Sequence, residues 1–151
     1  MPYLYRGLRK AEVEAGYKLI PKGVQTFENM NLVSANASGT YDLREYGPLV
    51  AAANHIRGLP TSGVSTTTNF ETAKRYSLSG LEPTGIVVRI DRSCLAKYNI
   101  VEHWVNQIFP SADWIDREEV ILENKAGSFP CEVVNQIYDV AKMKAKTWVR
   151  E

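Results

Sequence analysis

The sequence contains little cysteine, little histidine and almost no net charge. Its 151 residues include two cysteines and two histidines, and 18 basic residues nearly balance 17 acidic ones, giving a formal net charge of +1. So small a net charge creates no global field toward nucleic acid or an anionic membrane, and any such partner must bind a local patch. Cys94 and Cys131 lie far apart with no close Cys or His partner. This argues against a zinc site and favours buried free thiols over a disulfide.

Long apolar runs are also absent. No stretch approaches the roughly 20 apolar residues of a membrane span, and Met1 and Pro2 lead into strand-like sequence without the features of an export signal. We therefore expect a cytoplasmic protein without a membrane partner. A chain of 151 residues that is 44% hydrophobic can bury one good core and is too short for two. The sequence predicts a single domain over residues 1–151.

The chain does contain many short apolar segments separated by turn residues. Segments rich in apolar and β-branched side chains predict strands over residues 3–6, 85–90, 119–122 and 132–140. Segments with helical spacing and suitable capping residues predict helices over residues 9–15, 49–56 and 68–77. Because helices dominate the first half and strands the second, the pattern predicts an α+β domain with a mostly antiparallel sheet.

Three polar groups stand at the ends of strand-like stretches: Arg6, the cluster Ser65-Thr66-Thr67, and Glu119. Alone, each has an ordinary interpretation: a surface arginine, a helix cap and a solvent-facing carboxylate. Together they suit a dinucleotide. A guanidinium can bind two phosphate oxygens at once, and hydroxyls can hydrogen-bond a ribose. A carboxylate can stabilise the positive charge that develops as a sugar–nitrogen bond breaks.

The order and spacing of these groups resemble the mono-ADP-ribosyltransferase family, especially its branch similar to heat-labile enterotoxin and cholera toxin. Tyr5-Arg6-Gly7 looks like the first-strand arginine motif of that family, and residues 19–23 are similar to the loop after it. Gly63-Val64-Ser65-Thr66-Thr67 resembles its Ser-Thr-Ser motif with the last serine replaced by threonine. Residues 116–120 are similar to the catalytic loop, and residues 136–138 to the closing strand.

The resemblance covers most of the chain and implies a fold, a co-substrate and a site. The fold would have split, mostly antiparallel sheets around a cleft for NAD, the co-substrate. Arg6, beside Gly7, would bind the NAD phosphates, and Ser65, with Thr66 and Thr67, would support the nicotinamide end. Glu119 would be the catalytic acid.

The chain departs from this family pattern at Arg117. Family members that modify arginine carry a second glutamate two residues before the catalytic one, where this chain has a cation that would repel an incoming guanidinium. Arginine is therefore not the expected acceptor, unless a one-residue shift places Glu118 or Asp116 there. Arg117 instead suits an anionic or nucleobase acceptor. The basic and aromatic tail, residues 142–150, could follow a nucleic-acid strand or form a solvated helix end.

Further residues have two interpretations each. His55 could reach the cofactor or cap a helix, and Phe70 could cover the nicotinamide ring or pack in the core. Trp114 could contact the acceptor or be buried in the core, and Arg117 and Glu118 are further candidates for acceptor binding.

The resemblance thus implies an NAD-dependent ADP-ribosyltransferase that modifies an intracellular macromolecule, either RNA, DNA or a protein. One alternative is an NAD glycohydrolase, in which water is the acceptor. The other is a non-catalytic member that binds NAD or nucleic acid. By family analogy alone, we expect a toxin of a toxin–antitoxin or phage-defence system with an inhibitory partner protein.

Overall fold

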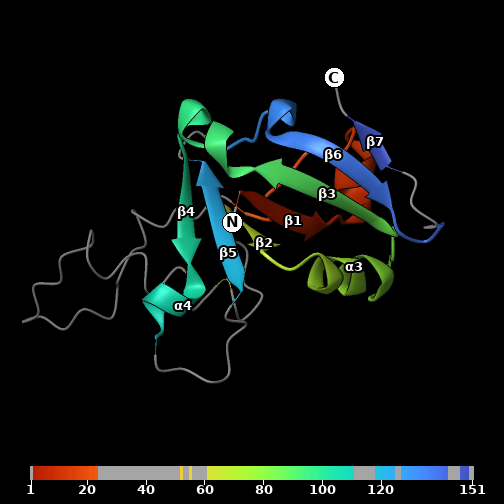
Figure 1. The fold of residues 1–151 in the computed structure, drawn as a ribbon, viewed down its shortest axis with the longest axis horizontal. Coiled ribbons are helices and arrows are strands. Elements are labelled where there is room, and N and C mark those ends of the chain that lie inside the picture. Colours follow the sequence, from red (N-terminus) through yellow and green to blue (C-terminus); the bar gives the residue numbers. More distant parts are fainter. Residues whose placement is uncertain are drawn as a thin grey trace, which may run out of the picture.

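An antiparallel sheet organises the part of the chain that the computed structural model describes, which comprises residues 2–23, 52, 55, 61–110, 118–124, 127–142 and 147–149. Its seven strands lie in the order β4-β5-β2-β1-β3-β6-β7 (Figure 1). The strands are β1 (Tyr3–Gly7), β2 (Gly63–Thr67), β3 (Ile86–Asp91), β4 (Ile100–Trp104), β5 (Glu119–Asn124), β6 (Val134–Asp139) and β7 (Thr147–Val149). The described helices are α1 (Lys10–Glu14), α3 (Phe70–Leu78) and α4 (Val105–Ile108), with 3-10 turns η1 (Arg92–Cys94), η2 (Ala96–Tyr98) and η3 (Cys131–Val133).

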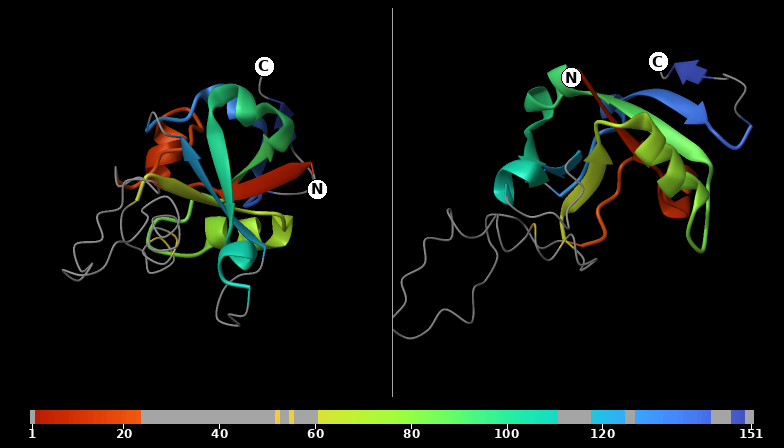
Figure 2. Two further views of the ribbon diagram at one scale, coloured as in Figure 1. Left: turned by 90° about the vertical axis from the view of Figure 1, so that its left-hand side faces the viewer. Right: turned by 60° about the horizontal axis from the view of Figure 1, so that its bottom comes forward.

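Two layers cover the sheet on opposite faces. Neighbouring residues of a strand point to opposite faces, and Val88 packs in the main core with Leu4, whereas Val87 packs with Ala73 of α3. Val13 of α1 packs against the main core, so α1 and α3 lie on either side of β1 (Figure 2). The α+β class is therefore confirmed.

A seam runs through the sheet between β1 and β2. These two strands pair only at Tyr5 and Thr67 among the described residues, whereas β1 pairs with β3 along its whole length and β2 does so with β5. The split sheets implied by the family resemblance therefore correspond to one sheet with a weak junction. That junction leaves the edges of β1 and β2 open to other contacts.

Helix α3 packs directly on the end of β1, and Gly7 makes this possible. A Cβ atom at Gly7 would lie 2.5 Å from the carbonyl oxygen of Ala73 and 2.7 Å from the backbone nitrogen of Ser77. Both neighbours are backbone atoms that cannot rotate away. Asn69 fixes the start of the helix, because its side chain accepts the N–H groups of Glu71 and Thr72.

The strands predicted from apolar runs are confirmed as β1, β3, β5 and β6, although β6 begins at Val134 because η3 precedes it. β4 was not predicted as a strand, and β2 was predicted only as a strand-like stretch without bounds that ends at Ser65-Thr66-Thr67. The hydroxyl side chains of β2 form a sequence pattern that is typical of a helix cap. The segment is a strand in the structure because β5 and β1 pair with it on its two sides.

The helices predicted over residues 9–15 and 68–77 are confirmed as α1 and α3. The helix predicted over residues 49–56 lies outside the described residues except for Ala52 and His55, which are both helical. The expectation that helices lie mainly in the first half is not confirmed. α1 and most of α3 do lie there, but so do β1 and β2, and α4 lies in the second half.

Both cysteines are free, as expected, but only Cys94 is partly buried. Cys131 is exposed, because it opens the surface turn η3 rather than a buried strand. Within the described residues, no helix combines the length and apolar character that crossing a bilayer requires.

Candidate active site

A cleft of about 1020 Å³ opens at the seam between β1 and β2. Its walls come from the end of β1, the start of α1, β2, and the segment that follows α3, with Glu119 contributed by the start of β5. The residues predicted from the sequence that line it are Arg6, Gly7, His55, Ser65, Thr66, Thr67 and Glu119. The structure thus brings the arginine, the hydroxyl cluster and the carboxylate together, while their chemical roles stay predictions.

Ser65 and Glu119 meet because β2 and β5 are paired strands. Thr67 lies opposite Glu119 in this ladder, and residues two apart on a strand share a face, so Ser65 points to the same side as Glu119. The hydroxyl of Ser65 donates a hydrogen bond to Oε2 of Glu119 at 2.7 Å. An ionised Glu119 can only accept, so this bond uses the single hydrogen of the serine hydroxyl.

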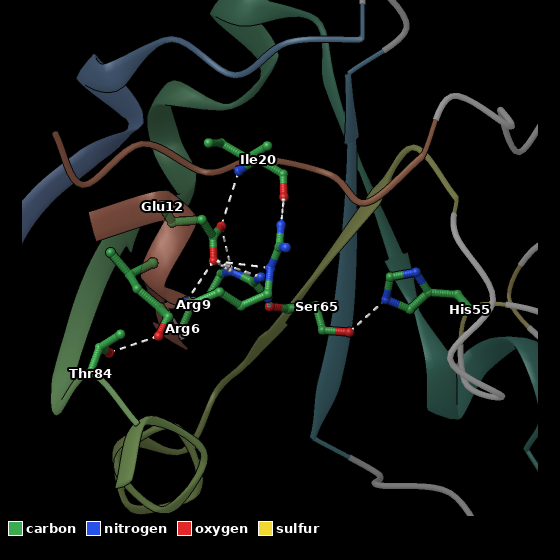
Figure 3. Close-up of polar contacts among 8 residues, drawn as sticks. Arg6, Arg9, Glu12, Ile20, His55, Ser65 and Thr84 are labelled. Carbon is green, nitrogen blue, oxygen red and sulfur yellow. Dashed lines mark hydrogen bonds and ion pairs between the residues drawn. The ribbon is translucent and has the colours of Figure 1, made fainter. Parts of the chain in front are cut away.

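His55 extends this contact into a chain of hydrogen bonds. Its Nε2 lies 2.6 Å from Oγ of Ser65 (Figure 3). Its Nδ1 lies 2.7 Å from Oγ1 of Thr61. Because Ser65 gives its hydrogen to Glu119, Ser65 must accept from His55, which places the imidazole proton on Nε2. Nδ1 then accepts from Thr61, whose oxygen in turn accepts the N–H of Gly63 at 3.2 Å. The chain runs in one direction, from Thr61 through His55 and Ser65 to Glu119.

The protonation state of His55 agrees with this chain. Burial, followed by the positive charges of Arg6 and Lys22, lowers the pKa of His55 from 6.5 to about 4. The ring is therefore neutral at pH 7 and carries one N–H, as the direction of the hydrogen bonds requires. A neutral His55 holds Ser65 in place without adding positive charge beside Glu119.

Arg6 is held by a partner that the sequence analysis missed. Glu12 of α1 is fully buried, and its carboxylate accepts Nε of Arg6 at 3.0 Å and Nη2 at 2.9 Å (Figure 3). On the other side, Nη1 of Arg6 donates to the backbone oxygen of Ser65 at 2.8 Å. Arg6 thereby joins α1 to β2 across the seam.

Other missed residues supply charge along the cleft. Arg9, Lys10 and Lys22 line it and carry positive charge, while Glu82 adds a carboxylate at the side formed after α3. The side chains of Tyr76 and Leu81 also line the cleft and are exposed. The sequence indicated these cleft residues only weakly. Isolated charged residues near turns are common, and it is the fold that brings them to one cleft.

Thr66 and Thr67 line the cleft with hydroxyls that already serve the fold. Oγ1 of Thr66 donates to the backbone oxygen of Val120 at 2.6 Å, and Oγ1 of Thr67 accepts the N–H of Asn69 at 3.1 Å. Both side chains are buried. Their contribution is therefore to fix β2 beside β5 and to start α3.

Some predicted residues lie elsewhere. Phe70 packs edge-on against Tyr5 and Tyr138, with ring centroids 5.5 and 5.0 Å away, and is not among the residues lining the cleft. Glu118 is exposed, and its backbone oxygen accepts the N–H of Thr68 at 3.2 Å. Arg117 and Trp114 lie outside the described residues.

No protein-family model matches this sequence, and no curated protein matches it either. Solved structures do match. Scabin, a toxin from Streptomyces scabies, was solved in complex with NADH and superposes with a TM-score of 0.50 and 21% identity. That match covers 89% of this chain and 62% of the Scabin chain, so this chain spans less than two thirds of it.

A single-residue variant of Scabin gives a TM-score of 0.51 and 20% identity, covering 93% of this chain and 68% of the variant. The chain has an ADP-ribosyltransferase-like fold. At this level of identity, the similarity to Scabin concerns the fold alone. It agrees with the fold that the sequence motifs implied.

Proposed function

We propose that the protein is an NAD-dependent ADP-ribosyltransferase. The observation that carries this proposal is the hydrogen bond from Ser65 to Glu119 in the same cleft as Arg6. Arginine, serine and glutamate are the residue types that the family resemblance assigns to the site. The Scabin structure with NADH supports a nicotinamide dinucleotide as the ligand of this fold.

The cleft suits such a ligand in size and charge. Small-molecule sites commonly enclose roughly 300–1,000 Å³, and the cleft measures about 1020 Å³. Arg6, Arg9 and Lys22 offer the cations that a pyrophosphate needs. Glu119 and Ser65 would hold the nicotinamide ribose at the β2–β5 side of the cleft.

The chemistry follows from the charge on Glu119. As the bond between ribose and nicotinamide breaks, positive charge develops on the sugar ring, and a carboxylate held beside it stabilises that charge. Ser65 fixes the orientation of Glu119, and His55 fixes Ser65. The chain's own residues therefore supply a preorganised negative charge, and a nucleophile then adds to the sugar carbon.

The acceptor and the biological setting stay proposals. The cation Arg117 favours a nucleic-acid acceptor over arginine, and a macromolecular target in the cytoplasm is expected for a toxin-type enzyme. An inhibitory antitoxin and a role in phage defence rest on family analogy alone. Water as the acceptor would make the protein a glycohydrolase, and loss of turnover would make it a binding protein.

One experiment separates these possibilities. The protein is incubated with NAD labelled in the adenylate moiety and a cell lysate, and portions of the product are treated with protease or nuclease. We expect nuclease-sensitive label with the wild-type protein and none with Glu119→Gln. Protease-sensitive label would identify a protein acceptor, and free ADP-ribose alone would identify a glycohydrolase. Intact NAD after prolonged incubation would contradict an enzymatic function.

A further inference from the structure

Glu12 is a buried carboxylate just outside the cleft. Its side chain is fully buried and is not among the residues lining the cleft, so it has no direct route to a ligand. Oε1 accepts Nη2 of Arg6 at 2.9 Å and the backbone N–H of Arg9 at 3.0 Å. Oε2 accepts Nε of Arg6 at 3.0 Å and the backbone N–H of Ile20 at 3.0 Å.

These contacts saturate the carboxylate. An ionised carboxylate has about four lone-pair sites, and four N–H groups from three segments occupy them. Burying a charge is costly unless it is paired and hydrogen-bonded, and buried ion pairs often add little net stability. A residue this deeply buried and this fully bonded therefore determines where its partners lie.

The partner with the greatest functional consequence is Arg6. A guanidinium has five N–H groups; Glu12 takes two of them along one edge, and the backbone oxygen of Ser65 takes one on Nη1. Two N–H groups remain without a partner among the described residues, one on each Nη nitrogen. Both nitrogens lie at the end of the planar guanidinium away from its aliphatic stem, and Arg6 lines the cleft, so phosphate oxygens bound there can accept from them.

The same carboxylate also fixes the adjoining rim of the cleft. Ile20 lines the cleft, and its N–H binds Glu12 while its carbonyl oxygen accepts Nη2 of Arg9 (Figure 3). Glu12 therefore holds Arg6, the start of α1 and the segment at Ile20 in one arrangement.

We propose that Glu12 is a positioning residue for the pyrophosphate of a bound dinucleotide. It occupies one edge of Arg6, formed by Nε and one N–H of Nη2, so that the remaining N–H groups of Nη1 and Nη2 are left for phosphate oxygens in the cleft. This inference rests on the proposed function, because it assumes that a nucleotide pyrophosphate binds beside Arg6. Glu12 and the backbone of Ser65 thus hold the guanidinium of Arg6 in one orientation before a ligand binds.

The test is a double-mutant cycle on binding, with three probes. Calorimetry measures the affinities of NAD, ADP-ribose and nicotinamide riboside for the wild type, Glu12→Gln, Arg6→Gln and the double variant, well below their melting temperatures. We expect Glu12→Gln to weaken ADP-ribose and NAD binding by about tenfold or more, the scale of one misplaced charge-assisted hydrogen-bond pair. Nicotinamide riboside, which has no phosphate, should bind with unchanged affinity.

The double variant decides whether Glu12 acts through Arg6. If it does, the double variant binds ADP-ribose within about twofold of Arg6→Gln alone, because Glu12 has nothing left to position. Glu14→Gln is the matched control, since Glu14 lies on the same helix with an exposed side chain paired to Lys10. This control should bind all three probes as the wild type does.

Glu12→Asp provides a second variant should Glu12→Gln fail to fold. Aspartate keeps the negative charge, but its side chain is one methylene shorter than that of glutamate. This variant should therefore bind ADP-ribose several-fold more weakly than the wild type and bind nicotinamide riboside with the wild-type affinity. Unchanged ADP-ribose affinity in either folded variant would overturn the inference, as would multiplicative losses in the double variant. Equal loss for all three probes would also overturn it, since that result indicates general disorder. A wild type that binds neither NAD nor ADP-ribose would instead refute the proposed function.

Discussion

Ser65 and Glu119 lie 54 residues apart in the sequence and share a 2.7 Å hydrogen bond across the β2–β5 ladder. The strand pairing brings the two side chains to the same face, and the bond leaves the carboxylate with little freedom to rotate. The position of Glu119 is thus set by the sheet rather than by a flexible loop. A charge held in place before the reaction needs no reorganisation during it.

Ser65→Ala should lower the rate of NAD cleavage by roughly 10- to 100-fold, the range expected for a hydrogen bond to a charged group. Single-turnover kinetics with saturating NAD measures this rate. Ser93→Ala is the control, because Ser93 is exposed and binds Asp91 away from the cleft. A Ser65→Ala rate equal to that of the control would show that Ser65 does not position Glu119.

The stability of the protein should fall as the pH drops from about 6.5 to about 4, owing to His55. The pKa of His55 is lowered in the folded state to about 4, so the unfolded chain takes up the proton first and is favoured as the pH falls. The full loss amounts to about 3 kcal/mol for such a shift. Urea unfolding at a series of pH values measures the free energy of unfolding of the wild type and of His55→Gln. Both proteins have the same carboxylates, so the difference between the two free energies reports the titration of His55. A difference that does not vary with pH would contradict the lowered pKa.

The sequence identified the strands whose side chains carry their own signal. β1, β3 and β5 are apolar or β-branched runs, and this pattern is visible in the sequence without reference to a neighbouring strand. β2 was expected only as an unbounded strand-like stretch, because its hydroxyls resemble a helix cap and its strand character depends on pairing with β1 and β5. The local sequence pattern was therefore sufficient to predict β1, β3 and β5. It was not sufficient to predict the bounds of β2, which lies at the seam.

The same limit applies to the site. Arg6, Ser65 and Glu119 were identified through a family resemblance that keeps their order along the chain. Glu12 was missed, because its contacts to Arg6 and Ile20 depend on how α1 folds back over β1. One sequence feature could have indicated Glu12: a glutamate three residues after the start of a helix often accepts the backbone N–H at that start, as Glu12 does from Arg9.

NAD should raise the melting temperature of the wild type, and Arg6→Lys should lose most of that increase. The stabilisation that a ligand gives rises with the logarithm of its concentration over its Kd for the folded state. A lysine can neither bind two phosphate oxygens with a planar fork nor bridge Glu12 and Ser65. Thermal shift at a series of NAD concentrations measures the effect. Lys97→Gln, at an exposed site over the ring of Tyr98, should keep the full increase. Equal NAD shifts in Arg6→Lys and the wild type would argue against a role for Arg6 in binding.

Gly7→Ala should destabilise the fold by about 1–3 kcal/mol, because the added methyl group would overlap backbone atoms of α3. Gly16→Ala offers a comparison, since nothing lies within 4 Å of a Cβ there and only its φ of +84° is unfavourable. Denaturant unfolding should show a smaller loss, of about 1 kcal/mol, for Gly16→Ala. The opposite ranking would mean that α3 does not pack on Gly7 as described.

The most direct measurement of the central claim is the single-turnover rate of NAD cleavage by Glu119→Gln, with NAD binding measured in parallel. Glutamine keeps the size of the side chain but removes the charge that stabilises the developing positive sugar. We predict near-normal NAD affinity and a rate lowered by roughly two orders of magnitude or more. Glu118→Gln, at the exposed neighbouring position, should cost much less. A Glu119→Gln protein that cleaves NAD at the wild-type rate would contradict the proposed mechanism.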